Sequence, residues 1–396
     1  MAVNLIDDVN SKFSYSAGLD FAGTCFSLGT EGVNLTLVQT LTIVKLSPNA
    51  QCIIYHISLL CISHNISWKP KQQSPPQHDE TLVYNQEWLS SLPKEKGIIV
   101  DYTYQYQGFW YSPLGLQGLI DCQQHFRARK NDVFLVTAPK SGTTWMKAIL
   151  YALVNRQNHP PHQAHHPLRK NTPHQLVPFF ETTKPSEYDS LFVDSSSRIF
   201  GCHFPIISLP KSITEADADG SANVKIVYLC RDIRDTFLSL FHFANNASLR
   251  PSPISLEETF HFFCRGTTTG GPIWEQILGY WKESLERPDK VLFMRYEELK
   301  SEPRAQIRRL AQFLGKPFSP EEENSEMIDD ILSLCSFGNM SKLQVNNTGH
   351  LVPGLSNSSF FRNGQVGEGN KCLTAEMAAQ LDQITEEKFR GSGLVL

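Results

Sequence analysis

The chain has 396 residues, a formal net charge of −4, and 41% hydrophobic and 11% aromatic residues. This length allows one large domain or two ordinary ones, and the composition is sufficient for a sizeable buried core. The near-neutral charge argues against a general nucleic-acid-binding protein, which is usually basic, so we expect no nucleic-acid partner.

Cysteine usage and the N-terminus predict a cytoplasmic protein. The nine cysteines form no C-x-x-C pair and their number is odd, which favours reduced thiols over a disulfide framework. The first ten residues are acidic and lack the basic region of a signal peptide. The apolar run at 52–62 is too short to span a bilayer, so we expect no membrane partner.

Residues 1–80 are predicted to be an atypical N-terminal extension that is poorly ordered. They lack the cap and turn patterns that organise a domain. The segment 69–80 is polar and proline-rich, which is typical of a linker. Orderly patterns begin near Thr81, so the sequence predicts one domain over 81–396.

From Thr81 onward, strand patterns of the buried type alternate with helical patterns. We expect, in chain order, a helix at 81–92, an aromatic-rich segment leading into a helix at 104–126, a strand at 132–139, a helix at 143–154, a strand at 224–232, a helix at 233–244, a strand at 290–299 and a helix at 303–315. This alternation predicts an α/β fold with a parallel β-sheet flanked by helices on both faces. Such sheets bind ligands at the carboxyl ends of their strands, where Lys140, Arg231 and Tyr296 are expected.

The segment 139–145, PKSGTTW, joins a predicted strand to a predicted helix and looks like a phosphate loop. A helix start offers an anion free N–H groups and the positive end of the helix dipole. The candidate anion ligands are Lys140, Ser141, Gly142, Thr143 and Thr144. Trp145 adds a flat face for a nucleobase. The loop departs from the pattern G-x-x-x-x-G-K-[ST], because its lysine precedes the only glycine.

Two further segments carry candidate residues. Arg231 and Ser239 are eight residues apart in YLCRDIRDTFLSLFHF and could together bind a second phosphate. The simpler alternative is a surface ion pair between Arg231 and Asp232 or Asp235. His203 lies between an apolar run and a proline turn, where it is either a half-buried structural histidine or a general base.

Two loops complete the set. The glycine-rich segment 360–374 holds Arg362 and Gly364 and is either part of a site or a plain surface loop. Five histidines lie within 159–174. Their proline-broken spacing provides no fixed ligand geometry, which favours a loop over a metal site.

Together these segments resemble the cytosolic sulfotransferases that use 3'-phosphoadenosine 5'-phosphosulfate (PAPS), and the plant branch most closely. The resemblance covers roughly residues 80–396 and rests chiefly on PKSGTTW and YLCRDIRDTFLSLFHF, with plant-like segments at 91–97, 104–118 and 386–396. It implies a P-loop-like parallel sheet related to the nucleotide kinases.

The resemblance also implies a role for each site residue. It assigns the 5'-phosphosulfate to Lys140, Ser141, Gly142, Thr143 and Thr144, the 3'-phosphate to Arg231, Ser239, Arg362, Asn363 and Gly364, and the adenine to Trp145, Tyr296, Ser336 and Phe337. His203 would be the catalytic base, and Lys140 would stabilise the charge that grows on the bridging oxygen.

The implied reaction is direct, in-line sulfuryl transfer from PAPS as co-substrate, with no metal and no covalent enzyme intermediate. The partner would be a small hydroxylated acceptor such as a flavonoid, a steroid or a hydroxyjasmonate. We expect an apolar, aromatic acceptor pocket with a contribution from 106–111.

The last motif departs from the family pattern R-K-G-x-x-G-D-W-K. Asn363 replaces a lysine, Glu368 the aspartate, Gly369 the tryptophan and Asn370 the second lysine. Loss of one cationic phosphate contact costs about 1.5–3 kcal/mol, or one to two decades of affinity. The family's dimer motif is not reproduced beyond Thr374, so a monomer or a weak homodimer is expected.

Two alternatives follow from these features. A P-loop kinase or NTPase would need the Walker lysine position and an acidic Mg²⁺ partner, and neither is evident. A catalytically impaired relative that still binds PAPS, or its product 3'-phosphoadenosine 5'-phosphate (PAP), is suggested by the altered loop at 362–371.

Overall fold

The computed structural model describes residues 85–192, 197–215, 223–247, 249–250 and 252–396. These residues belong to one compact unit, Asp79–Leu396. The extension predicted over 1–80 and the first four residues of the helix predicted at 81–92 lie outside the described residues.

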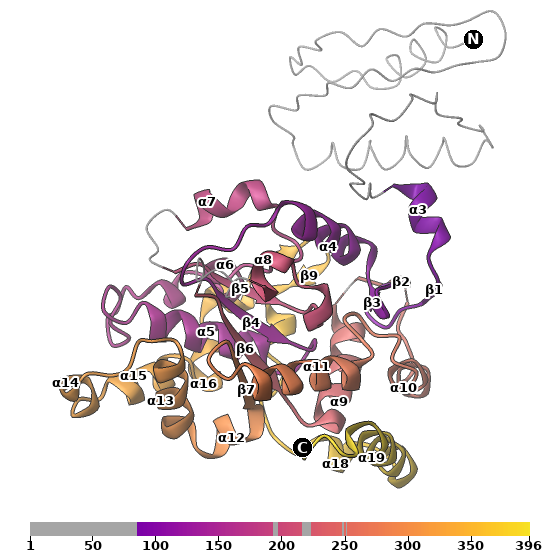
Figure 1. Cartoon of the computed structure of the whole chain (residues 1–396). Coiled ribbons are helices and arrows are strands. Elements are labelled where there is room, and N and C mark those ends of the chain that lie inside the picture. The colour runs from indigo at the N-terminus through magenta and orange to yellow at the C-terminus, as the bar shows by residue number, and fades with distance from the viewer. Residues whose placement is uncertain (1–84, 193–196, 216–222, 248, 251) are drawn as a thin grey trace, which may run out of the picture. The chain divides into compact units, whose positions relative to one another are not determined.

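A four-stranded parallel sheet with strand order β5-β4-β6-β7 forms the centre of this unit (Figure 1). The strands are β4 (Val133–Thr137), β5 (Ile199–Cys202), β6 (Lys225–Cys230) and β7 (Val291–Arg295). Val133 pairs with Ile199 on one side and Lys225 on the other, which aligns the carboxyl ends. Every residue of β4 is buried, as its continuous apolar run predicts.

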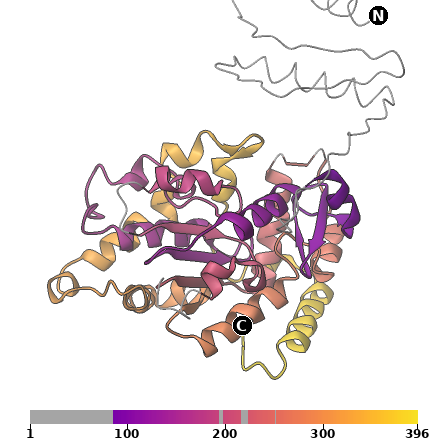
Figure 2. The same cartoon turned by 45° about the horizontal axis from the view of Figure 1, so that its top comes forward.

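Helices cover both faces of the sheet (Figures 1 and 2). The helices on one face are α4 (Pro113–His125), α9 (Ile233–Asn246), α11 (Ile273–Glu286) and α19 (Ala375–Phe389). Those on the other face are α5 (Thr143–Val154), α12 (Tyr296–Ser301), α13 (Pro303–Phe313) and α15 (Met327–Leu334). Side chains alternate along a strand, so Phe134 packs in the first core and Leu135 in the second. The predicted α/β fold is confirmed.

Element boundaries follow local sequence. Helix α5 spans the residues predicted for it and begins directly after Gly142. The strand predicted at 290–299 is too long, because β7 ends at Arg295, opposite the last residue of β6, Cys230. The chain then enters α12, whose first turn contains Glu297, an acidic residue that suits the positive end of the helix dipole.

The aromatic segment before α4 forms an antiparallel sheet that its composition alone did not define. Its strands are β1 (Lys94–Lys96), β2 (Tyr102–Tyr106) and β3 (Phe109–Tyr111). Gln107 and Gly108, between β2 and β3, both have positive φ, as a tight hairpin turn requires. Ser112 then caps α4 by accepting the Gly115 N–H.

The described part of the chain also contains shorter α-helices and strands, and four 3-10 helices at Pro167–Arg169, Pro185–Glu187, Ile206–Ser208 and Asn357–Phe360. The shorter α-helices and strands are α3 (Gln86–Ser91), α6 (Pro173–Leu176), α7 (Tyr188–Leu191), α8 (Lys211–Thr214), α10 (Leu256–Cys264), α14 (Pro320–Glu323), α16 (Phe337–Met340), α17 (Gln344–Asn347), β8 (His350–Val352), β9 (Leu355–Ser356) and α18 (Gly369–Cys372). Within the described ranges, no helix is both long enough and apolar enough to cross a bilayer.

Candidate active site

The carboxyl ends of the parallel strands border a cavity of about 1170 Å³. His203 follows β5, Lys140 follows β4, and Arg231 and Tyr296 directly follow β6 and β7. A parallel sheet therefore collects residues more than 150 positions apart at one edge.

The cavity gathers all but one of the site residues predicted from sequence. Those lining it are Lys140, Gly142, Thr143, Thr144, Trp145, His203, Arg231, Ser239, Tyr296, Ser336, Phe337, Arg362, Asn363 and Gly364. Ser141 does not line it. It is only 2% exposed, and its backbone N–H donates to the Ala138 carbonyl within the turn of the loop.

The loop between β4 and α5 has a constrained backbone. Lys140 has a φ of 72° and Gly142 a φ of 104°, and such a value is uncommon for a lysine. Glycine is required at position 142 for two reasons: its φ is positive, and a Cβ there would lie 2.7 Å from Cδ2 of Tyr296. Thr143 and Thr144 then form the first turn of α5, where backbone N–H groups have no helical acceptor.

Lys140 lies in an environment that disfavours its charge. Its ammonium is 3.9 Å from the centroid of the Phe243 ring and 5.6 Å from that of Phe360. These aromatic faces favour the ammonium, but burial, and then repulsion by Arg362 and Arg231, together lower the pKa of Lys140 to about 7. An anion in the cavity would relieve all these effects, because it would supply the missing countercharge.

His203 is held as a neutral imidazole with one nitrogen engaged. Its Nδ1 lies 2.8 Å from the Thr137 carbonyl, which can only accept, so Nδ1 carries the proton. Burial lowers the pKa of His203 to about 4, although this hydrogen bond opposes the shift. The geometry leaves Nε2 with a lone pair for a proton acceptor role in the cavity.

Arg231 is buried and belongs both to an ion pair and to the cavity lining. Its Nη2 donates to Asp235 Oδ2 at 3.3 Å and to the Gln365 carbonyl at 2.7 Å. Its Nε has no partner among the described residues. The pair with Asp235 that the sequence offered as an alternative therefore exists, but it lies inside the protein. Ser239 lines the cavity two turns further along α9.

The segment 360–374 is anchored to the rest of the site. Asp235, 1% exposed, accepts the backbone N–H of Gly367 at 2.9 Å and that of Gly369 at 2.7 Å. The Tyr296 hydroxyl donates to the Gly364 carbonyl at 3.1 Å. Two buried side chains hold its backbone, and its residues 360–364 line the cavity, so this segment is not a plain surface loop.

In this loop, Glu368 is hydrogen-bonded to both side chains that the resemblance assigns to the 3'-phosphate. Its carboxylate accepts hydrogen bonds from Arg362 and Asn363. Asn363 therefore donates to a carboxylate at the position where the family has a cation. A phosphate entering here would compete with Glu368 for the same donors.

Aromatic groups form the end of the cavity assigned to adenine. Trp145 and Tyr296 are in edge-on contact with centroids 5.3 Å apart. Ser336 caps α16 by accepting the Asn339 N–H, which fixes the start of the helix that carries Phe337. Gly364 packs closely on this side, since a Cβ there would lie 2.9 Å from Phe337.

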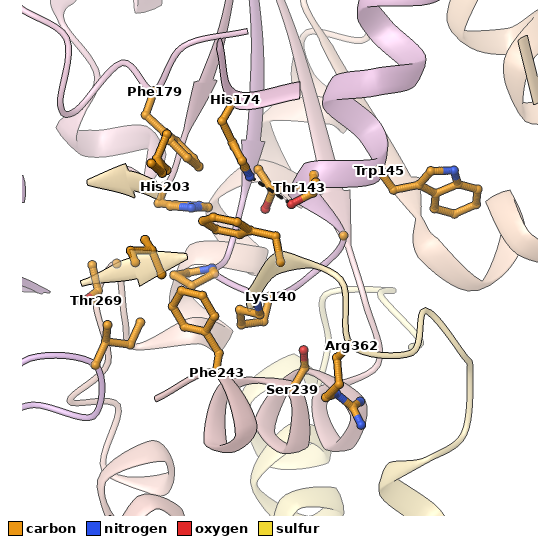
Figure 3. Close-up of a pocket in the computed structure, with 18 of the residues that line it drawn as sticks. Lys140, Thr143, Trp145, His174, Phe179, His203, Ser239, Phe243, Thr269 and Arg362 are labelled. Carbon is orange, nitrogen blue, oxygen red and sulfur yellow. Dashed lines mark hydrogen bonds between the residues drawn. The ribbon is translucent and has the colours of Figure 1, made fainter. Parts of the chain in front are cut away.

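The opposite end of the cavity is apolar. Its lining includes Tyr104, Tyr111, Phe179, Phe204, Phe243, Leu249, Leu351 and Phe360. Figure 3 shows His174, His203 and Phe179 on one side of Lys140 and Trp145 on the other. Within the segment 106–111 expected to contribute, Tyr111 lines the cavity.

Three polar residues at this end were not identified from the sequence: Lys147, His174 and Glu181. Lys147 is fully buried, and His174 and Glu181 are at least nine-tenths buried and line the cavity. Burial raises the pKa of Glu181 to about 7, and one of its oxygens has no partner among the described residues. A lysine inside the apolar pattern of α5 was the one available signal in the sequence.

The histidine-rich segment is irregular, as expected. It consists of turns and short helices, and the buried His166 accepts the Leu168 N–H. No group of three or more His, Cys, Asp or Glu residues in the described part of the chain is arranged to hold a metal ion.

Comparison with known proteins identifies the family. The model of the sulfotransferase domain matches residues 130–393. Cytosolic sulfotransferase 13 of Arabidopsis thaliana is 42% identical over 308 residues, covering 78% of this chain and 92% of that protein. The crystal structure of a putative steroid sulphotransferase from Arabidopsis thaliana is 38% identical, with a TM-score of 0.61, and covers 78% and 94% of the two chains. A retinol dehydratase in complex with androsterone and PAP shares the fold at 21% identity, with a TM-score of 0.59 over 78% and 93% of the chains.

Proposed function

The chain belongs to the sulfotransferase family and is a PAPS-dependent sulfotransferase, and from that premise we propose its acceptor class and the roles of its residues. It transfers the sulfuryl group to a hydroxyl of a small, largely apolar acceptor, with His203 as the base. One observation carries this proposal: a neutral histidine and a lysine follow adjacent strands, between an apolar and a cationic, aromatic end of one cavity.

The described residues fit both ends of PAPS. Lys140 and the α5 N-terminus, with Gly142, Thr143 and Thr144, would hold the 5'-phosphosulfate, while Ser141 supports the turn. The 3'-phosphate would be held by Arg231, Ser239, Arg362, Asn363 and Gly364. The adenine would lie among Trp145, Tyr296, Ser336 and Phe337.

The reaction follows from these positions. The acceptor hydroxyl gives its proton to Nε2 of His203, and its oxygen forms a bond to sulfur. The bond between sulfur and the bridging phosphate oxygen breaks in line, and PAP leaves with the electron pair. Lys140 in its ammonium form stabilises the charge on that leaving oxygen, so no covalent enzyme intermediate is needed.

The acceptor end favours flat, apolar molecules. Phe179, Phe243 and Phe360 bring aromatic surface close to Lys140 and His203. Flavonoids, steroids and hydroxyjasmonates all combine an apolar body with a hydroxyl. A relative of known structure is called a putative steroid sulphotransferase, which supports including steroids in the test. We place the reaction in the cytosol, since the curated relatives are cytosolic sulfotransferases.

The test is transfer of labelled sulfate from PAPS to a panel of these acceptors. His203→Ala should abolish turnover, because no other base replaces Nε2, and PAP affinity should be unchanged. Turnover that survives this substitution would refute the assignment of the base. A wild-type protein that binds PAP but transfers no sulfate to any acceptor would instead support the catalytically impaired alternative.

A further inference from the structure

A hydrogen-bonded chain joins the phosphosulfate loop to a lysine that the mechanism above does not use. Oγ1 of Thr144 lies 3.2 Å from Nε2 of His174. Nδ1 of the same ring lies 3.3 Å from Nζ of Lys147. Lys147 is fully buried and His174 is 5% exposed, so this chain is shielded from bulk water.

The surrounding sequence makes room for the lysine. Lys147 lies three residues after Thr144 in α5, on the same side of the helix. Its neighbour in β5 is Gly201, where a Cβ would lie 2.1 Å from Cε of Lys147. Its ammonium is 3.1 Å from the centroid of the Phe179 ring. An apolar side chain would fill this space without the desolvation cost of an amine, so packing alone does not account for a lysine.

The partner of Nδ1 of His174 decides whether Nε2 of the same ring donates or accepts a hydrogen bond. A neutral imidazole donates at one nitrogen and accepts at the other. Burial, and then repulsion by Lys147, keep the pKa of His174 well below its ordinary value, so the ring is neutral. Burial lowers the pKa of Lys147 well below its ordinary value, and an anion bound at the loop favours its ammonium form. In that form Lys147 can only donate, so Nδ1 accepts and Nε2 carries the hydrogen. Nε2 then donates to Thr144, whose own hydroxyl hydrogen is left to point into the cavity.

We propose that Lys147 and His174 are positioning residues that turn the Thr144 hydroxyl toward an oxygen of the sulfuryl donor. The identity of that donor rests on the proposed function. We call the hydrogen-bonded chain from Lys147 through His174 to Thr144 the relay. A bound anion favours the charged form of Lys147, and charged Lys147 in turn orients the Thr144 hydroxyl toward the anion. The other titratable groups facing Lys147 are Glu181 before β5, Cys202 within β5 and His203 after it. Lys140 in the loop faces His174 and His203.

A double-mutant cycle tests the relay by equilibrium binding of PAPS without acceptor, a measurement that does not depend on turnover. Thr144→Val removes the hydroxyl at constant shape. His174→Phe keeps a flat ring against Phe179 and Phe360 and removes both nitrogens. We expect each single variant to weaken PAPS binding about tenfold, and the double variant to bind no worse than Thr144→Val. Additive losses, about a hundredfold together, would overturn the relay.

The lysine is tested separately. Lys147→Met preserves length and packing and should weaken PAPS binding about as much as Thr144→Val. Lys282→Met, on the exposed side of α11, is the matched control and should bind as wild type does. A folded Lys147→Met protein with wild-type affinity would refute the proposal. Failure of wild-type protein to transfer sulfate while binding PAPS would count against the proposed function alone, whereas absence of PAPS binding would refute both.

Discussion

At the scale of single residues, Lys140 couples nucleotide binding to pH. In the free protein, burial and two arginines hold its pKa at about 7, whereas a bound phosphate would raise that pKa. Above pH 7 the free protein must therefore take up a proton when PAP binds. We expect the Kd for PAP to rise by up to about tenfold per pH unit above pH 7, and calorimetry in buffers of different ionisation enthalpy should detect the proton uptake.

The matched variant is Lys140→Met. It should bind PAP more weakly at pH 6, by about one to two decades, and should lose the dependence on pH above 7. A wild-type Kd that stays constant between pH 6 and 9 would show that Lys140 is already charged in the free protein.

Asn363 marks a second point where affinity can be tested at one residue. It lines the cavity, and its amide donates to Glu368 instead of offering a charge to the 3'-phosphate. Asn363→Lys should tighten PAP binding by about tenfold and steepen its weakening with salt, because one more cation would contact phosphate. The readout is Kd at two salt concentrations. Asn324→Lys, exposed and outside the cavity lining, controls for net charge. Equal affinity of Asn363→Lys and wild type would mean that Glu368 retains the new lysine.

At the scale of elements, α18 packs closely against α9, a contact that the altered family motif did not reveal. We call this contact the α18–α9 joint. Gly369 stands where the family has a tryptophan, yet a Cβ there would lie 2.6 Å from the Arg234 backbone carbon and from the Arg234 Cβ. Helix α9 thus approaches this position too closely for any side chain. The glycine is therefore a packing requirement of this chain and cannot be reversed by restoring the tryptophan.

Gly369→Ala tests this joint. The added methyl should push α18 away from α9 and strain the hydrogen bond from the Gly369 N–H to Asp235. We expect a loss of about 1–3 kcal/mol in the free energy of unfolding, measured by urea denaturation, together with weaker PAP binding. The control is Gly338→Ala, where the Cβ meets no atom within 4 Å and stability should be unchanged or slightly higher. If Gly369→Ala has the same free energy of unfolding as wild type, α18 and α9 can move apart with little loss of stability.

The same scale shows what the sequence could and could not predict. Strands β4, β6 and β7 and helix α5 are local patterns, so apolar runs and helical spacing located them. The cluster of Lys147 and His174 is not local. It forms because the chain at Phe179 runs parallel to β5, where Phe179 forms a bridge with Gly201, and this brings α6 alongside α5. No periodicity within either segment encodes that juxtaposition.

At the scale of the whole molecule, the two cores explain why one edge of the sheet can carry the chemistry. Each face of the sheet is fully covered, so the backbone at the carboxyl edge is held rigidly by packing on both sides. The four strand ends then fix His203, Lys140, Arg231 and Tyr296 in one lining. Binding and catalysis depend on loops whose positions are set by the strands they follow.

This arrangement predicts that residues 1–79 are dispensable for the chemistry. Among the residues that the structure describes, those lining the cavity all lie at or beyond Ile99, and the first core with the side chains packed against it runs from Trp88 to Leu396. A chain beginning at residue 80 should therefore bind PAP with the same Kd as the full chain and unfold at the same Tm. Differential scanning calorimetry and PAP titration would measure both. A chain beginning at residue 105 is the control: it lacks β1 and most of β2, as well as Ile99 and Tyr104, and should be destabilised and lose acceptor turnover. A shorter chain from residue 80 with weaker PAP binding would place part of the nucleotide site in the first 79 residues.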